Sequence, residues 1–189
     1  MKSSVFGAAL GAIAMLAAGT TPVSAQDKDV LGWVEMTRIM PWGIPVKMKL
    51  DTGALTSSMQ GDKIETFDKD GEKWVRFEVE LENEDTGKVE KRSFEKPVFR
   101  RVKLQGAGGI DRRYVVLMNV CVGDTIYEEQ FSLRDRDKFN YPVLIGRRSI
   151  QHWGLIDVTK TFLTEPECDE NSILRQYEER DEADEDIGA

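Results

Sequence analysis

The feature that most constrains the fold is a strand-like stretch that runs directly into an aspartate. Apolar and polar side chains alternate over residues 44–50, whose sequence is Ile-Pro-Val-Lys-Met-Lys-Leu. This period of two predicts a half-buried strand. Asp51, Thr52 and Gly53 follow at once. Gly53 permits a tight turn and Thr52 offers a hydroxyl for hydrogen bonding, so the carboxylate of Asp51 is expected on a rigid loop. A turn in which the aspartate only caps its own backbone is the alternative.

A second motif favours a functional loop over a simple turn. The sequence Tyr-Pro-Val-Leu-Ile-Gly over residues 141–146 predicts a short apolar strand that ends in glycine. Asp51-Thr52-Gly53-Ala54 resembles the active-site motif of aspartic proteases, with the alanine typical of the single-domain retroviral kind. In such retropepsins, a strand like Leu144-Ile145-Gly146 packs behind the catalytic loop.

Short strands separated by turns fill the rest of residues 31–163, which predicts an all-β fold. Residues 147–153 are expected to form one short helix. The Asp-Thr-Gly-Ala-Leu-Thr-Ser-Ser run and the Tyr-Pro-Val-Leu-Ile-Gly stretch make the chain similar to the bacterial retropepsin-like family, which is often labelled an ATP-dependent zinc protease. The resemblance implies a retropepsin-like closed β-barrel, the acid protease fold.

The resemblance also implies a mechanism. Asp51 is the expected catalytic residue, and the loop-supporting residues are Thr52, Gly53, Ala54, Leu144, Ile145 and Gly146. Two carboxylates must share a proton in this chemistry, and the chain has a single Asp-Thr-Gly. We therefore expect a homodimer in which Asp51 of two protomers activates a water. The expected function is an exported aspartic endopeptidase, and the alternative is a catalytically inactive peptide-binding or adaptor protein with the same barrel.

No cofactor or metal is expected. The sequence holds neither an HExxH motif nor a GxxxxGK[ST] loop, and it has one histidine, His152. Basic residues occur in clusters, and those expected to bind substrate are Arg101, Arg113 and Arg147. Their charge favours a peptide or protein substrate, with acidic peptides as the sharper hypothesis. Ordinary solvated surface is the alternative for these clusters.

Three regions are expected along the chain. Residues 1–25 contain an early lysine, an apolar run and Val23-Ser24-Ala25, which predicts a signal peptide cleaved near Ala25 and a periplasmic or secreted protein. Residues 26–164 are the predicted barrel domain, and residues 165–189 an acidic, partly disordered tail. The tail carries a net charge of −9 and the rest of the chain about +1, so we do not expect nucleic acid as a partner. No other stretch is apolar and long enough to span a bilayer, so no membrane span is expected.

Two questions stay open at this level. Cys121 and Cys168 are either bridged or separate, because sequence gives no distance between them. The hairpin that covers the substrate is either the glycine-rich segment 100–113 or the turn at 82–88. A short helix capped by Ser172 is expected in the tail.

Overall fold

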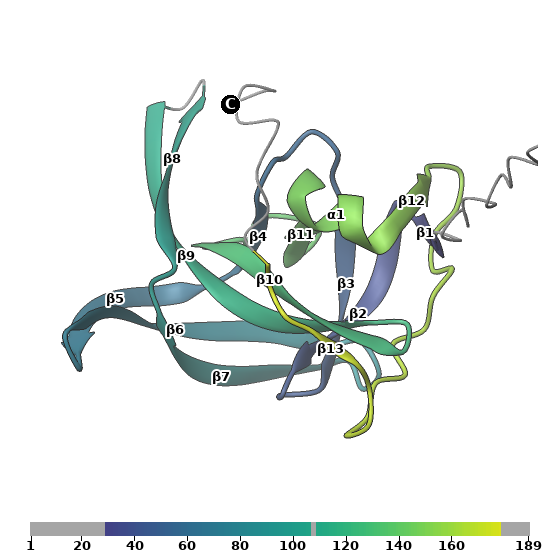
Figure 1. Ribbon diagram of the computed structural model, residues 1–189, viewed down its shortest axis with the longest axis horizontal. Coiled ribbons are helices and arrows are strands. Elements are labelled where there is room, and N and C mark those ends of the chain that lie inside the picture. Colours follow the sequence, from purple (N-terminus) through teal and green to yellow (C-terminus); the bar gives the residue numbers. More distant parts are fainter. Residues whose placement is uncertain (1–28, 107–108, 179–189) are drawn as a thin grey trace, which may run out of the picture.

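The computed structural model describes residues 29–106 and 109–178. The predicted signal peptide and the last eleven residues of the predicted tail lie outside this range. The described part is mostly β, with one short helix, as predicted (Figure 1). The elements are β1 Asp29–Gly32, β2 Val34–Met40, β3 Ile44–Leu50, β4 Ser57–Gln60, β5 Asp62–Lys69, β6 Glu72–Asn83, β7 Lys88–Pro97, β8 Arg100–Gly106, β9 Gly109–Val122, β10 Thr125–Arg134, β11 Val143–Ile145, α1 Arg147–Trp153, β12 Gly154–Asp157 and β13 Leu174–Arg175.

The main sheet closes on itself. Its strand order is β13-β10-β4-β11-β3-β2-β9-β8, and an additional pairing joins β10 to β9. The strands β10, β4, β11, β3, β2 and β9 therefore form a ring. A three-stranded sheet, β5-β6-β7, packs against this ring, and a parallel pair, β1-β12, forms a third small sheet.

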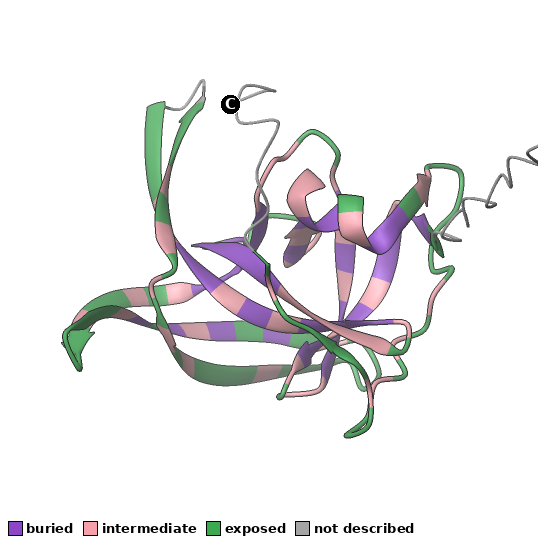
Figure 2. Ribbon diagram, viewed as in Figure 1, coloured by how far each residue is buried: buried purple, intermediate pink, exposed green. Residues whose placement is uncertain are grey.

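The alternation in the sequence decides which side chains enter the core. Val46, Met48 and Leu50 of β3 are buried, whereas Lys47 and Lys49 between them are half-buried. Figure 2 shows the same alternation along β6, where Val75 and Phe77 are fully buried. A single apolar cluster includes residues of the ring and of β6, so the two sheets share one core.

Segment 100–113 is a hairpin. β8 and β9 pair from Arg100↔Val115 to Gly106↔Gly109, and their joined ends project away from the ring (Figure 1). Gly109 has a φ of 102°, a conformation that favours glycine. Gly106 and Gly109 are therefore paired residues of a long hairpin and not part of an irregular connection.

A buried carboxylate holds the segment that follows β12 against β2. Glu35 is fully buried and accepts hydrogen bonds from the backbone N–H groups of Gly32 (2.5 Å), Leu163 (3.0 Å) and Thr164 (3.1 Å), and from the Thr164 hydroxyl (3.2 Å). Four donors satisfy this charge without a cation. The sequence analysis did not identify this role.

A disulfide anchors the C-terminal segment. Cys121 of β9 and Cys168 are bridged, with a Cα–Cα distance of 5.9 Å, which answers the question left open by the sequence. The helix expected after Ser172 is wrong: Leu174–Arg175 instead form β13, paired in parallel with Ile126 and Tyr127 of β10. The free edge of β10 offers backbone partners, and these override the weak local helix signal. Across the described residues, no helix has the length and apolar character needed to cross a membrane.

Candidate functional site

Asp51 begins the loop between β3 and β4, and its own backbone fixes it there. Its N–H donates to the carbonyl of Ile145 at 2.8 Å. Its carboxylate oxygen Oδ1 accepts the N–H of Gly53 at 2.9 Å, and its carbonyl accepts the N–H of Ala54 at 3.2 Å. The capping turn and the rigid loop, posed as alternatives by the sequence, therefore occur together.

The partner of the Asp51 carboxylate is a cation. Lys49 Nζ lies 3.2 Å from Oδ2, and the two side chains are 37% and 26% exposed. A half-exposed pair of this kind contributes little stability, but it places a positive charge beside the carboxylate. Among the described residues, no second acid forms a contact with Asp51.

Gly146 lets two backbones approach more closely than any other residue would. A Cβ at this position would lie 2.6 Å from the carbonyl oxygen of Leu55 and 2.8 Å from the carbonyl carbon of Thr56. The Gly146 N–H donates to Ser57 Oγ at 3.0 Å. Ile145 pairs in parallel with Leu50. Leu144, Ile145 and Gly146 thus lie directly beside the Asp51 loop, as expected from the resemblance.

A buried polar network supports the contact between Gly146 and the end of the Asp51 loop. Ser57 Oγ lies 3.1 Å from Ser149 Oγ, which donates to Glu129 at 2.9 Å. Trp153 Nε1 donates to the other oxygen of Glu129 at 3.1 Å. The network joins β4, α1 and β10. This network was not predicted, because no local sequence pattern distinguishes a buried Glu129 from a surface acid.

The two arginines at the start of α1 have different roles. Arg147 Nη1 donates to the carbonyl of Thr52 at 2.7 Å, so this side chain fastens the loop and does not line the pocket described below. Arg148 does line it, and its Nη1 donates to Thr56 Oγ1 at 3.0 Å. The structure therefore places Arg148, and not the predicted Arg147, in the lining of this pocket.

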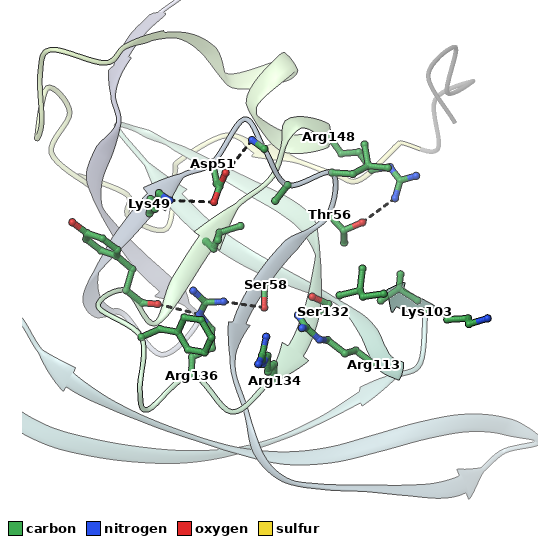
Figure 3. A pocket seen from close by; sticks show the side chains of 18 of the residues that line it. Lys49, Asp51, Thr56, Ser58, Lys103, Arg113, Ser132, Arg134, Arg136 and Arg148 are labelled. Atoms are coloured by element: carbon green, nitrogen blue, oxygen red, sulfur yellow. Dashed lines mark hydrogen bonds and ion pairs between the residues drawn. The ribbon is translucent and has the colours of Figure 1, made fainter. Parts of the chain in front are cut away.

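Asp51 opens onto a pocket of about 1080 Å³ (Figure 3). Its walls come from the Asp51 loop, β8, the end of β10 and the loop that follows β10. Asp51 is the one acid among the described lining residues. The basic lining residues are Lys49, Arg100, Arg101, Lys103, Arg113, Arg134, Arg136, Lys138 and Arg148. The field inside the pocket is therefore strongly positive.

Two of the three predicted substrate-binding residues line this pocket. Arg101 lies on β8, with its guanidinium 5.1 Å from the centre of the Tyr114 ring. Arg113 lies opposite on β9, where it forms an ion pair with Asp111 at 2.7 Å. Of the two segments considered as the covering hairpin, residues 100–105 and Arg113 of the β8–β9 hairpin line the pocket, whereas residues 82–88 do not.

Three acids outside the pocket could hold a metal ion. Asp62, Asp135 and Asp137 present carboxylate oxygens within 4.8 Å of one another, and the amide of Gln60 donates to Asp62 and Asp137 at 2.8 Å. Asp135 and Asp137 are exposed. Exposed acids often cluster without an ion, and Gln60 already supplies a donor, so the geometry assigns no cation here.

Comparison with known proteins identifies the family. The family model described as "RimB-like: Retropepsin-like aspartic endopeptidase RimB" matches residues 30–167. A solved structure from Legionella pneumophila, of the protein Lpg0085 of unknown function, is similar with a TM-score of 0.62 and 31% identity. The match covers 75% of this chain and all of that one.

The curated relatives carry a different kind of name. Proteins from Shewanella halifaxensis (31% identical, 73% of this chain) and Desulfotalea psychrophila (30% identical, 69% of this chain) are both named "Probable alpha-L-glutamate ligase". The chain spans only about 30% of the length of these relatives. The ligase name therefore describes proteins more than three times as long as the matched part. The family and these relatives are named as enzymes.

These names correct one prediction. The expected function was an exported aspartic endopeptidase acting through Asp51 of two protomers, with a catalytically inactive peptide-binding or adaptor protein as the alternative. The curated relatives are named ligases and not peptidases, so the predicted function and the classification as a protease or hydrolase are wrong by this comparison. A short motif reveals the family, but it does not determine what a member does.

Proposed function

Because the chain belongs to the RimB-like family of retropepsin-like proteins, we propose that it is an enzyme domain whose substrate is an acidic, glutamate-bearing peptide chain. The substrate enters the pocket beside Asp51. The relatives' name supports the choice of glutamate, since it identifies L-glutamate as the compound that those proteins ligate.

The observation that carries this proposal is the charge of the pocket. Among the residues that the structure describes, nine lysine and arginine side chains line it, against the single acid Asp51. Such a lining attracts carboxylates and repels basic peptides. Its volume of about 1080 Å³ is slightly above the range of typical small-ligand pockets, and a few residues of an extended peptide fit that space.

Binding to three peptides of equal length tests the proposal. The full chain is titrated with fluorescein-labelled penta-glutamate, penta-glutamine and penta-lysine, and binding is measured by fluorescence polarisation at two salt concentrations. We expect penta-glutamate to bind, with an affinity that falls as salt rises, and the other two to bind at least tenfold more weakly. Equal binding of penta-glutamate and penta-glutamine would refute the proposed substrate.

Product analysis tests the enzymatic part. Penta-glutamate is incubated with the chain in the presence of L-glutamate and ATP, and its length is followed by mass spectrometry. A change of length that is lost in Asp51→Asn and retained in Glu80→Asn would assign the chemistry to Asp51. Glu80 is a suitable control because it lies on β6, does not line the pocket and is 53% exposed. An unchanged peptide under all conditions tested would contradict an enzymatic role on this substrate.

The proposal includes a homodimer. Val30 of β1 and Leu155 of β12 are register partners, and they are 50% and 57% exposed, so an apolar patch lies on the β1–β12 sheet. Contact between two copies would cover this patch. The ring of six strands is, in the same proposal, the closed β-barrel expected of the retropepsin fold. Sedimentation equilibrium of the full chain and of Leu155→Asp measures the assembly: we expect a dimer for the first and a monomer for the second.

A further inference from the structure

Arg136 is a buried cation that faces the pocket. It lies in the loop after β10, and only 7% of the residue is exposed, yet it belongs to the pocket lining. In Figure 3 its guanidinium points toward Ser58. Two neighbouring basic residues that line the pocket, Arg134 at the end of β10 and Lys138 in the loop after it, are exposed. Arg136 is therefore the buried cation among these three basic residues.

The contacts that hold Arg136 are with neutral groups. Its backbone N–H donates to Gln60 Oε1. In the side chain, Nε donates to the carbonyl of Tyr141 at 3.0 Å, and Nη1 lies 3.5 Å from Ser58 Oγ. The guanidinium carbon is 4.7 Å from the centre of the Phe139 ring. Within residues 29–106 and 109–178, no acid forms an ion pair with Arg136.

The surroundings of Arg136 oppose its charge. Burial lowers the pKa of the guanidinium, and the neighbouring charges of Arg134 and Arg113 lower it further, while Asp51 acts in the opposite direction. Groups that face Arg136 are thus mostly neutral or positive. A buried charge is retained at this expense when a partner of opposite sign completes the site.

We propose that Arg136, together with Ser58 and Arg134, forms a subsite that binds a carboxylate group of the ligand. The inference rests on the proposed function, and it deepens that function by naming the side chain that recognises acidity. Arginine suits the task, because its planar fork can donate two parallel hydrogen bonds to one carboxylate. The carbonyl of Tyr141 accepts a hydrogen bond from the guanidinium Nε of Arg136, and Gln60 Oε1 accepts one from its backbone N–H. The Phe139 ring lies 4.7 Å from the guanidinium of Arg136 and 4.9 Å from that of Arg134, so it packs against both arginines.

Two labelled peptides distinguish the possible sources of the carboxylate. Penta-glutamate with an amidated C-terminus offers side-chain carboxylates only, and penta-glutamine with a free C-terminus offers only the terminal one. Binding of each peptide to the full chain is compared with binding to Arg136→Gln. The control is Arg92→Gln, which removes the same charge from an exposed position on β7 outside the pocket.

The expected result is specific to one residue and one chemical group. Arg136→Gln should weaken one of the two peptides by at least about 30-fold, because a desolvated charge pair is lost, and Arg92→Gln should weaken it less than about twofold. The peptide that is affected identifies the source as side-chain or terminal carboxylate. If Arg136→Gln and Arg92→Gln bind both peptides equally well, the subsite is refuted, while binding of penta-glutamate to the unaltered chain would still support the proposed substrate. If the unaltered chain binds neither peptide, both proposals fail.

A measurement on the unaltered chain covers the case in which Arg136→Gln does not fold. The Nε–Hε signals of the arginine side chains are followed by ¹H–¹⁵N NMR during titration with each peptide, with Arg136→Lys used to assign the Arg136 signal. A saturable shift of that signal with the amidated penta-glutamate or with the free C-terminus of penta-glutamine supports the subsite. A signal that stays in place while the peptide binds overturns it.

Discussion

The substitution Gly146→Ala tests whether close backbone contact holds the Asp51 loop in place. The added methyl would lie 2.6 Å from the Leu55 oxygen and 2.8 Å from the carbonyl carbons of Leu55 and Thr56. These are backbone atoms and cannot rotate away. The loop itself is hydrogen-bonded to β11 and α1 through Asp51 N–H to Ile145 and Arg147 N–H to Ala54. One of these segments must therefore move.

The magnitude follows from the kind of overlap. Overpacking in a core costs about 1–3 kcal/mol when side chains can adjust, and a backbone clash belongs at the upper end of that range. We expect a loss of about 3 kcal/mol in the free energy of unfolding. This corresponds to a melting temperature lower by roughly 6–12 °C for a chain of this size. Urea unfolding measures the loss, and the slope of the transition should stay unchanged.

Gly61→Ala is the matched control, because Gly61 is also a buried glycine. A Cβ there would meet the Leu133 side chain at 3.5 Å and the Phe77 ring at 3.6 Å, which are ordinary contacts. We expect a loss below about 1 kcal/mol. If the two variants are equally stable, the clash at Gly146 is relieved cheaply, and the argument that this glycine clamps the loop is refuted.

Three further predictions concern the buried acid, the pocket and the disulfide. Glu35→Gln should lower the free energy of unfolding by about 2 kcal/mol, because an amide nitrogen replaces one of the two oxygens that together accept four hydrogen bonds. Urea unfolding measures this loss, with Glu80→Gln as the exposed control. Equal stability of the two variants would contradict the role of the charge. Asp51→Asn should raise the affinity for penta-glutamate by about threefold in fluorescence polarisation, since it removes the one acid of the pocket lining, and a lower affinity would place the peptide elsewhere. Replacing Cys121 and Cys168 by serine should lower the free energy of unfolding by about 4 kcal/mol, given a separation of 47 residues. Thermal unfolding of the variant and of the unaltered chain, with and without reductant, gives the comparison. Equal stability would mean that loss of the bridge does not increase the conformational entropy of the unfolded chain.

Patterns local to one stretch of sequence predicted much of the fold. The alternation before Asp51 became β3, the apolar run before Gly146 became β11, and the segment after it became α1. Asp70-Gly71 forms the predicted hairpin turn, with φ of 54° and 83° at the two residues. These features depend on side-chain periodicity and on turn chemistry, both of which can be read without knowing the partner strand.

The features that were missed depend on distant partners. β4, Ser57–Gln60, is wholly buried although three of its four residues are polar, because Ser57 and Gln60 find hydrogen-bond partners 75 or more residues away. Glu35 accepts hydrogen bonds from backbone N–H groups about 128 residues along the chain. Arg136 gave no signal either, since a single arginine in a charged loop is typical of a surface. Polar residues become part of a core only when the fold supplies their partners.

The Asp51 loop joins β3 and β4, which both pair with β11 within a closed ring. This arrangement fixes the number of residues in the loop. β3 and β4 both pair with β11, so one residue added or removed between Leu50 and Ser57 would push one strand out of register and turn its side chains to the opposite face. Relatives that differ in ligand preference should therefore differ here by replacement of residues and not by insertion. Variation in chain length is expected instead at the tips of the β5–β6, β6–β7 and β8–β9 hairpins, where an extra residue disturbs no closed circuit of strands.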